Sequence, residues 1–210
     1  DRDNKARRRG KGDTVLKFLA IDTSGNRLTV VAVNGETAVK RTDCDCAQKF
    51  SVRLMGEIEN ACADAHLRVA DCDFIACAVG PGSFTGIRIG IATVKGICFA
   101  CGIPALAVTS FEAIAYAETG RKRLALIDAG HGNFYACGYS ETNTVEIPPA
   151  YLSGGEVSEL VNKGYAPVGP ADVDLAEGLL RAAAAKHAEA GGTQTLTALY
   201  LRKSSAEEKR

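Results

Sequence analysis

The sequence contains the same arrangement of strand, turn and strand twice, and this repetition most restricts the possible fold. In the first half, an apolar run ends at Asp22, and the turn 23–26 leads to a second apolar run over 28–33. In the second half, the run 123–128 also ends in aspartate, and a turn leads to 134–139. Ordered internal similarity of this kind indicates a duplicated unit. We therefore predict an α/β protein of two related β-β-β-α-β-α halves, the second one trimmed.

Length and composition fit two small halves flanked by polar tails. The chain has 210 residues, of which 46% are apolar, which is enough to bury a real core. We predict the first half at 15–104 and the second at 105–202, followed by a polar tail over 203–210. Residues 1–14 are rich in lysine and arginine, and we interpret them as a disordered tail, with an RNA-contacting arm as the alternative.

Helical periodicity predicts the main helices. Phe50, Leu54 and Ile58 recur at helical spacing, and Gly102 suits the end of a helix. Ser110 is expected to cap a shorter helix. The predicted helices cover 47–66, 85–101, 110–118 and 175–190.

Both candidate strand-end aspartates suit two different roles. A carboxylate at a strand end, followed by hydroxyls as in Asp22-Thr23-Ser24, suits a phosphate or metal site. Without a ligand, the same residues form a turn whose aspartate accepts backbone hydrogen bonds. We expect Asp22 and Asp128 to face the cleft between the halves as remnants of a phosphate or nucleotide site, with no metal bound tightly.

The segment Gly80–Gly90 follows a strand and opens a helix. Its glycines allow another backbone to approach closely, and Ser83 or Thr85 can cap the helix. The segment lacks the Gly-Lys-Ser/Thr end of a P-loop. A nucleophilic Ser83 would need a histidine and an acid, and no motif places the three histidines beside it. No catalytic residue is therefore assigned, and no pair of histidines has the spacing of a helical metal site. The histidines are His66, His131 and His187.

The helix predicted over 85–101 is apolar around most of its circumference. Such a helix lies wholly inside its domain or is covered on one side by a partner. We favour a partner interface, with tight packing inside the chain as the alternative. The candidate interface residues are Gly82, Ser83, Phe84, Gly86, Ile87, Gly90, Ile91 and Val94, together with Phe50 and Leu54 of the first helix.

Charge and cysteine usage restrict partners and compartment. The net charge is zero, whereas a protein that grips tRNA alone usually has a strongly basic face. Most of the eight cysteines lie in apolar runs, which predicts buried free thiols in the cytoplasm. Cys98 and Cys101 form a CxxC pair without further metal ligands, and a redox role for them stays open. No uncharged apolar stretch has membrane-spanning length, so no membrane association is expected.

Five segments, in this order, resemble the TsaB/YeaZ family of tRNA threonylcarbamoyladenosine biosynthesis proteins. The resemblance extends from Leu16 to Arg202, and its most specific part is Gly-Ser-Phe-Thr-Gly-Ile-Arg. It implies a duplicated RNase-H-like fold of the actin, Hsp70 and sugar-kinase type. The segments are Leu-Ala-Ile-Asp-Thr-Ser at 19–24, the glycine-rich motif at 79–96, Gly-Ile-Pro at 102–104, Leu-Ile-Asp-Ala at 126–129 and Tyr-Leu-Arg at 200–202.

The resemblance also implies a function and partners. A non-catalytic scaffold of this family pairs with a TsaD-type catalytic paralogue, in a complex that includes a TsaE-type ATPase. The complex transfers a threonylcarbamoyl group onto N6 of the adenosine next to the tRNA anticodon, and this chain would meet tRNA only through it. A homodimer is the alternative to the heterodimer. No tightly bound cofactor is expected, although weak ATP or ADP binding is compatible with the fold.

Two features depart from the family pattern, and two other functions remain open. Family members often have a histidine where this chain has Asp-Cys-Asp-Cys-Ala-Gln at 43–48. The turn 129–132 is Ala-Gly-His-Gly in place of the Ala-Arg-x-Gly that is frequent in the family. The alternatives to the scaffold function are an ATP-dependent small-molecule kinase of the actin fold, which would use Asp22 and Asp128, and a glycoprotease-like peptidase.

Overall fold

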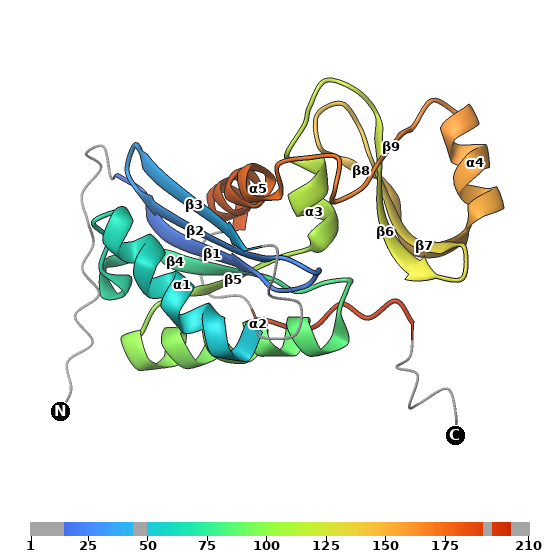
Figure 1. The fold of residues 1–210 in the computed structure, drawn as a ribbon. Helices are drawn as coiled ribbons and strands as arrows, with labels where there is room; N and C mark the ends of the chain where they lie inside the picture. Colours follow the sequence, from blue (N-terminus) through green and yellow to red (C-terminus); the bar gives the residue numbers. More distant parts are fainter. Residues whose placement is uncertain (1–14, 44–49, 191–194, 203–210) are drawn as a thin grey trace.

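The protein folds around two mixed β-sheets, seen in a computed structural model that describes residues 15–43, 50–190 and 195–202 (Figure 1). The first sheet has the strand order β3-β2-β1-β4-β5, and the second has β8-β7-β6-β9. The strands of the first sheet are β1 (Lys17–Asp22), β2 (Leu28–Asn34), β3 (Thr37–Asp43), β4 (Phe74–Ala78) and β5 (Ala105–Val108). Those of the second sheet are β6 (Arg123–Gly130), β7 (Asn133–Tyr139), β8 (Val145–Ser153) and β9 (Ala166–Val168).

The second sheet repeats the topology of the first. β1 pairs antiparallel with β2 and parallel with β4, and β6 pairs in the same way with β7 and β9. In both sheets the third strand of the half lies outside the second, and only the counterpart of β5 is missing from the described residues. The prediction of two related halves, the second one trimmed, is confirmed.

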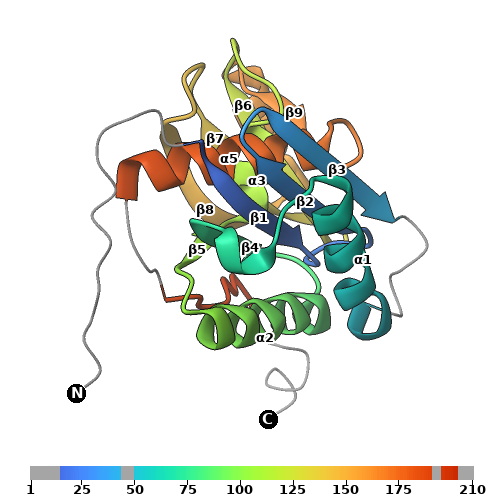
Figure 2. The same cartoon turned by 90° about the vertical axis from the view of Figure 1, so that its left-hand side faces the viewer.

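Helices cover both faces of the first sheet. α1 and α2 lie on one face and α5 lies on the other, as Figures 1 and 2 show. α3 packs between α5 and the second sheet, and α4 covers the outer face of that sheet. The helices are α1 (Phe50–Asp64), α2 (Phe84–Cys101), α3 (Ser110–Ala115), α4 (Gly154–Asn162) and α5 (Leu175–Ala190), with a short 3₁₀ helix η1 (Val69–Asp71) before β4.

β1 is the centre of the first half because both of its faces are buried. Leu19 and Ile21 pack toward α1 and α2, whereas Phe18 and Ala20 pack toward α5. A strand that is buried on both faces has a continuous apolar sequence in place of an alternating one. This explains why Phe18–Ile21, directly before Asp22, is an uninterrupted apolar run.

The bounds of α2 lie within one residue of the prediction. The hydroxyl of Ser83 accepts a hydrogen bond from the N–H of Gly86 at 3.2 Å, and Gly102 ends the helix with a φ of 68°. Among the described helices, α2 alone has the length and composition that could cross a membrane. Its residues Ile87 and Val94 are fully buried against the first sheet, so we interpret it as a helix packed on the protein surface.

Two predictions about the segment that joins the halves are wrong. Thr109, and not Ser110, caps α3, because Thr109 and Glu112 exchange hydrogen bonds in a capping box, and the helix ends at Ala115. The predicted boundary at residue 104 falls before β5, which pairs in parallel with β4 and so belongs to the first sheet. α5, from the second half, also packs back onto the first sheet.

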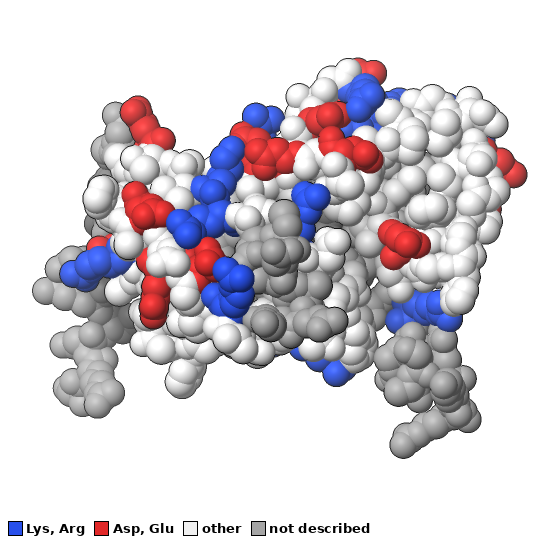
Figure 3. Space-filling view, viewed as in Figure 1, with Lys and Arg blue, Asp and Glu red and all other residues white. Residues whose placement is uncertain are grey.

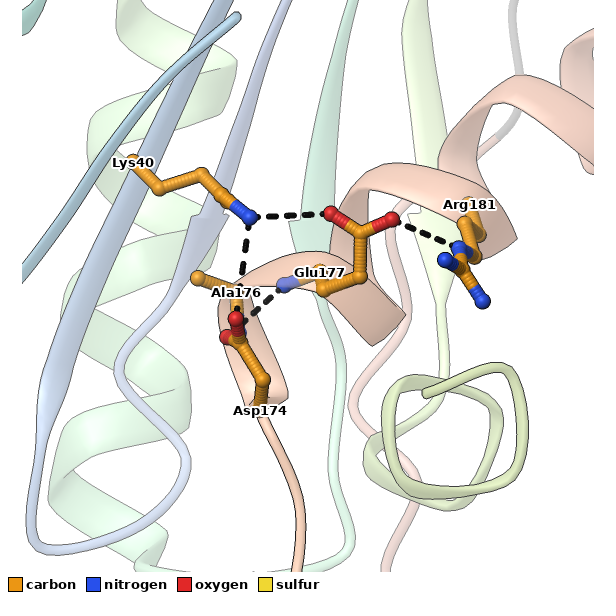
Figure 4. A network of polar contacts seen from close by, with 5 residues as sticks. All are labelled: Lys40, Asp174, Ala176, Glu177 and Arg181. Carbon is orange, nitrogen blue, oxygen red and sulfur yellow. Dashed lines mark hydrogen bonds and ion pairs between the residues drawn. The ribbon is translucent and has the colours of Figure 1, made fainter. Parts of the chain in front are cut away.

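A polar network fastens α5 to the edge of the first sheet (Figure 4). Lys40 on β3 donates a hydrogen bond to Glu177 at 2.9 Å and lies 3.6 Å from the carboxylate of Asp174. Asp174 caps the helix by accepting hydrogen bonds from the N–H groups of Ala176 and Glu177, both at 3.0 Å. Arg181 completes the network on Glu177 at 2.6 Å. The N-terminus of α5 is thereby tied to β3, on the other half.

We predict that Asp174→Ala lowers the free energy of unfolding by about 1 kcal/mol, the usual loss for an N-cap aspartate. The backbone hydrogen bond from Glu177 holds the pKa of Asp174 below its ordinary value, with a further contribution from Lys40. A lowered pKa means that this stability is present at neutral pH and is lost as the pH falls through the pKa of the folded state. Urea unfolding of the wild type and of Asp174→Ala, near neutral pH and in acid, measures the difference in their free energies of unfolding. This difference should be smaller in acid.

Asp71→Ala is the matched control for this prediction. Asp71 pairs with Arg68 at an exposed site three residues away, where the loss of one ion pair changes stability by less than about 0.5 kcal/mol. If the two substitutions lowered the free energy of unfolding equally, the cap of α5 would contribute no more stability than an exposed ion pair.

Candidate functional site

The two motifs that stand out in the sequence lie against each other in space. The hydroxyl of Thr23, just after β1, donates a hydrogen bond to the carbonyl of Gly86 in α2 at 2.8 Å. The N–H of Ser83 donates to the carbonyl of Ser24 at 2.6 Å. The turn after β1 therefore lies directly on the first turn of α2, and each motif satisfies polar backbone groups of the other.

This contact explains three glycines of the motif. A Cβ atom at Gly82 would lie 2.2 Å from the carbonyl oxygen of Ser24, and one at Gly86 would lie 2.0 Å from that of Thr23. At Gly90 a Cβ would lie 2.4 Å from the Thr23 hydroxyl. The sequence predicts that another backbone approaches these glycines. At Gly82 and Gly86 that backbone belongs to this chain, and at Gly90 the approaching group is a side chain of this chain.

The residues chosen from sequence as a partner interface are mostly inside the chain. Five large apolar members are buried in the core of the first half, between its sheet and α1 and α2: Phe50, Leu54, Ile87, Ile91 and Val94. Gly86 and Gly90 are buried as well, and Gly82 is half-buried. A partner cannot contact a side chain that the chain's own core covers. For the buried positions, the alternative of tight packing inside the chain is the correct one, and only Ser83 and parts of Gly82 and Phe84 reach the surface.

We predict opposite effects for alanine at two glycines of α2. Gly86→Ala should lower the free energy of unfolding by about 1–3 kcal/mol, because the new methyl group meets the fixed carbonyl of Thr23. At Gly96 a new methyl group would meet no atom within 4 Å, so Gly96→Ala should stabilise the protein by up to about 1 kcal/mol through helix propensity. Urea unfolding measures the free energy of unfolding of each variant. If both variants were more stable than the wild type, the close contact between Gly86 and the carbonyl of Thr23 would be contradicted.

A cavity of about 160 Å³ lies beside the contact between the motifs, where the two halves meet. Its polar wall includes Asp22, Ser24, Arg27 and Ser110, and its apolar wall includes Ile114, Ile127 and Leu175. The hydroxyls of Ser24 and Ser110 lie 2.7 Å apart and join the turn after β1 to α3. No local pattern in the sequence marks Arg27 or Ser110 as cavity residues, because both are brought there by the packing of the halves.

Asp22 is nearly buried at the wall of this cavity. One carboxylate oxygen, Oδ1, accepts a hydrogen bond from the N–H of Ser24 at 2.7 Å. Burial raises the pKa of Asp22, and the hydrogen bonds from Ser24 oppose that rise. An aspartate that loses water without gaining a cation is unfavourable when charged, which is typical of a carboxylate kept for a role other than stability.

Asp128 does not accompany Asp22. It is exposed on β6, and its carboxylate accepts a hydrogen bond from the N–H of Gly130 at 2.8 Å. Its neighbour Ile127 lines the cavity, and successive residues of a strand point to opposite faces. The structure therefore does not bring the two aspartates together, and Asp128 caps its own turn. Thr23 and Ser24 are buried next to Asp22, as the sequence suggests.

We predict that Asp22→Asn raises the free energy of unfolding near neutral pH. The raised pKa means that the folded state disfavours the charged carboxylate. This penalty is absent below the pKa of the unfolded state, near 3.8, and grows as the pH rises toward the folded value. Asparagine keeps the acceptor for Ser24 and carries no charge. Urea unfolding as a function of pH tests this, and a less stable Asp22→Asn near neutral pH would indicate that the carboxylate is stabilised by a cation.

The described cysteines are free thiols. Cys62, Cys72, Cys77, Cys98 and Cys137 are buried, and Cys101 is exposed, whereas Cys44 and Cys46 lie outside the described residues. Burial raises the pKa of Cys72 to about 12 and that of Cys98 to about 11, so neither is a reactive thiolate at neutral pH. No three His, Cys, Asp or Glu side chains of the described residues come together in a way that could hold a metal ion.

Sequence comparison relates the chain to a tRNA-modification family. The family model described as "TsaD: tRNA N6-adenosine threonylcarbamoyltransferase" matches residues 44–177. The chain is 33% identical over 132 residues to the tRNA threonylcarbamoyladenosine biosynthesis protein TsaB of Bacillus subtilis strain 168, and 29% identical over 128 residues to that of Escherichia coli K12. These alignments cover 61% and 59% of this chain, and 57% and 55% of the relatives, so the chain spans little more than half of their length.

Structural comparison extends the similarity over most of the chain. The structure described as YeaZ from Pseudomonas aeruginosa superposes with a TM-score of 0.74 at 25% identity, covering 89% of this chain and all of that one (100%). A second Pseudomonas aeruginosa structure, described as an uncharacterized protein with similarity to peptidase YEAZ, gives 0.75 at 27% identity with the same coverage. The duplicated arrangement of sheets and helices is thus shared with these proteins.

Proposed function

We propose, from the premise that this chain belongs to the TsaB/YeaZ family, that it is a non-catalytic scaffold and activating subunit for tRNA threonylcarbamoyladenosine biosynthesis. The reaction in question places a threonylcarbamoyl group on N6 of the adenosine next to the anticodon. The observation that carries the proposal is that α1 and α2 carry large apolar side chains that the described part of the chain leaves exposed.

This surface, which we call the helix face, contains the most exposed large apolar residues of the two helices. Phe99 is 92% exposed, Val52 77% and Met55 46%. Both helices lie on the same side of the first sheet (Figure 2). Single exposed apolar residues are common, but several large ones on neighbouring helices are typical of a protein interface. The residues chosen from the sequence lie on the buried sides of the same two helices, because the buried side is known only once the sheet is in place.

The proposed occupant of the helix face is the TsaD-type catalytic paralogue. A related protein of the same fold would present matching helices, and the two pairs would pack into a bundle. A TsaE-type ATPase joins the complex in this proposal, and a second copy of this chain is the competing occupant of the same face. Either partner buries Phe99, which suits an aromatic residue at the centre of an interface.

The histidines support a non-catalytic role. The ring of His187 stacks on Phe74 with a centroid distance of 4.2 Å, so it has a structural role. His66 and His131 are exposed in turns, with φ values of 49° and 56°. None of the three is part of a metal-ligand cluster among the described residues. The hydroxyl of Ser83 is used as a helix cap, which leaves the peptidase alternative without a prepared nucleophile.

We also propose that the chain binds no cofactor tightly, that ATP or ADP binds weakly at most, and that it works in the cytoplasm. A buried carboxylate at the cavity wall repels phosphate groups, and among the described residues Arg27 is the only basic one in the lining. On the face drawn in Figure 3, positive and negative side chains are mixed over the first half, and much of the second half is uncharged. This surface favours contact with tRNA as part of a complex that has a more basic partner.

Phe99→Asp tests the proposal. The chain and the catalytic paralogue should form a complex on a sizing column, and Phe99→Asp should weaken their association by at least about 30-fold, as expected for a central aromatic residue. Calorimetry measures the affinity, and circular dichroism checks that the variant is folded. Because Phe99 is almost fully exposed, the substitution should not disturb the core.

Val145→Asp is the control for a new charge at an exposed apolar position. Val145 is 50% exposed on β8, in the other half of the molecule, and its substitution should leave the affinity unchanged. If a folded Phe99→Asp variant bound the paralogue with wild-type affinity, the helix face would not be part of the interface. Gly90→Arg and Ile91→Asp are unsuitable as tests, because both positions are buried and the substitutions would disrupt folding.

A further inference from the structure

The terminal segment 195–202 presents alternate residues to the core and to the surface. Leu199 and Leu201 pack against the core that α3 forms with the second sheet, and the N–H of Leu199 donates to the carbonyl of Val79 at 2.8 Å. Tyr200 and Arg202, which alternate with these two leucines, are exposed. In Figure 1 the segment, drawn in red, passes the start of α2 and continues below the second half.

Tyr200 joins the terminal segment to the start of α2. Its ring stacks on that of Phe84 with a centroid distance of 4.5 Å and an interplanar angle of 25°. The guanidinium of Arg88 lies 3.8 Å from the centre of the Phe84 ring, and its Nε donates to the Tyr200 hydroxyl at 3.1 Å. Two segments that the sequence singles out separately, Phe84–Arg88 and Tyr200–Arg202, thus form one structure.

Arg202 continues the arrangement onto the second sheet. Its guanidinium lies 5.8 Å from the centre of the Tyr151 ring on β8. Tyr151 pairs in register with Tyr135 on β7, and their rings are 5.9 Å apart. These residues form a row of alternating aromatic and arginine side chains across both halves. We call it the aromatic strip: Phe84, Arg88, Tyr200, Arg202, Tyr151 and Tyr135.

We propose that the aromatic strip binds unpaired RNA, with bases stacked on Tyr200 and Tyr151 and phosphates next to Arg88 and Arg202. The proposal rests on the proposed function, which makes RNA the substrate of the complex. Tyr200 is 40% exposed and Tyr151 39%, so each ring keeps surface for a flat base. Arg88 has no ion pair with the described residues, and its terminal nitrogens can donate to a phosphate. Aromatic rings interleaved with arginines are the usual platform for single-stranded nucleic acid.

The strip and Phe99, the most exposed residue of the helix face, lie at opposite ends of α2. Phe84 and Phe99 are separated by about 22 Å along the helix axis, at 1.5 Å for each residue. A partner on the helix face can therefore leave the strip open to RNA. With two arginines as phosphate ligands, binding would depend mainly on stacking and only weakly on salt, with a slope of log K against log salt near −1.4.

The test uses a fluorescently labelled RNA hairpin with an unpaired loop, and a fully paired RNA duplex of the same length. Fluorescence anisotropy measures binding to this chain in its complex with the catalytic paralogue. The hairpin should bind more tightly than the duplex. Tyr151→Leu should weaken hairpin binding at least about fivefold, because it keeps apolar volume and loses the flat ring, whereas Tyr151→Phe should keep wild-type affinity. Arg88→Gln should reduce the salt slope by about 0.7.

Arg68→Gln, at an exposed arginine outside the strip, is the control for lost charge and should leave RNA affinity unchanged. Wild-type affinity of a folded Tyr151→Leu complex, or a preference for the duplex, would overturn the inference. Binding of a poly-glutamate peptide to the strip in place of RNA would assign it to an acidic protein and overturn it as well. A sizing column run on each variant reports pairing with the paralogue separately. A variant that pairs with the paralogue but loses RNA binding therefore reports on the strip alone. A failure of the wild-type chain to pair with the paralogue would count against the proposed function.

Discussion

The close contact between the turn after β1 and the first turns of α2 positions the rest of the first half. Gly86 and Gly90 let the helix approach Thr23 to a distance that no side chain would allow, and two hydrogen bonds fix the position. With α2 held there, Ile87 and Val94 fill the core beneath it, and Phe99 at the far end faces outward. The start of the same helix also positions Phe84 and Arg88 for contact with the terminal segment. One short-range constraint thus determines which surfaces α2 can offer.

The two halves share a topology but differ in what surrounds their first strands. In the first half, Asp22 is covered by the halves that meet around it. In the second half, the equivalent Asp128 is exposed, and the turn that follows it has no counterpart, among the described residues, of the contact between Thr23 and α2. A phosphate site built symmetrically from both aspartates would need both to face one cavity. The duplicated fold is retained here, whereas the paired acids of such a site are not.

Periodicity and turn signals predicted the duplicated topology, the bounds of α5, and those of α2 to within one residue, because each depends on local sequence. What they could not predict depends on packing between distant segments. β8 contains Pro148 and Pro149, which argue against a strand, but it is an edge strand where missing donors are tolerated. Arg123 begins a predicted strand yet is fully buried, and the turn 140–143 supplies acceptors for one terminal nitrogen of its guanidinium. α2 is apolar on nearly every side, so periodicity alone could not separate its core face from its exposed face.

The buried charge in the cleft and the exposed rings on the surface favour the proposed function on the outside of the molecule. The cleft contains an acid whose charge is disfavoured and one arginine in its lining, which is a poor environment for a nucleotide without a cation. The exposed features are instead aromatic and apolar: Phe99 on the helix face, and Tyr200 and Tyr151 on the strip. Large exposed rings that are held by stacking or by a rigid helix lose little conformational freedom on binding, which suits surfaces that meet macromolecules. In the function proposed above, such a subunit would contribute to the reaction by holding its partners in place, because its surfaces, and not a pocket of its own, would determine the geometry of the complex.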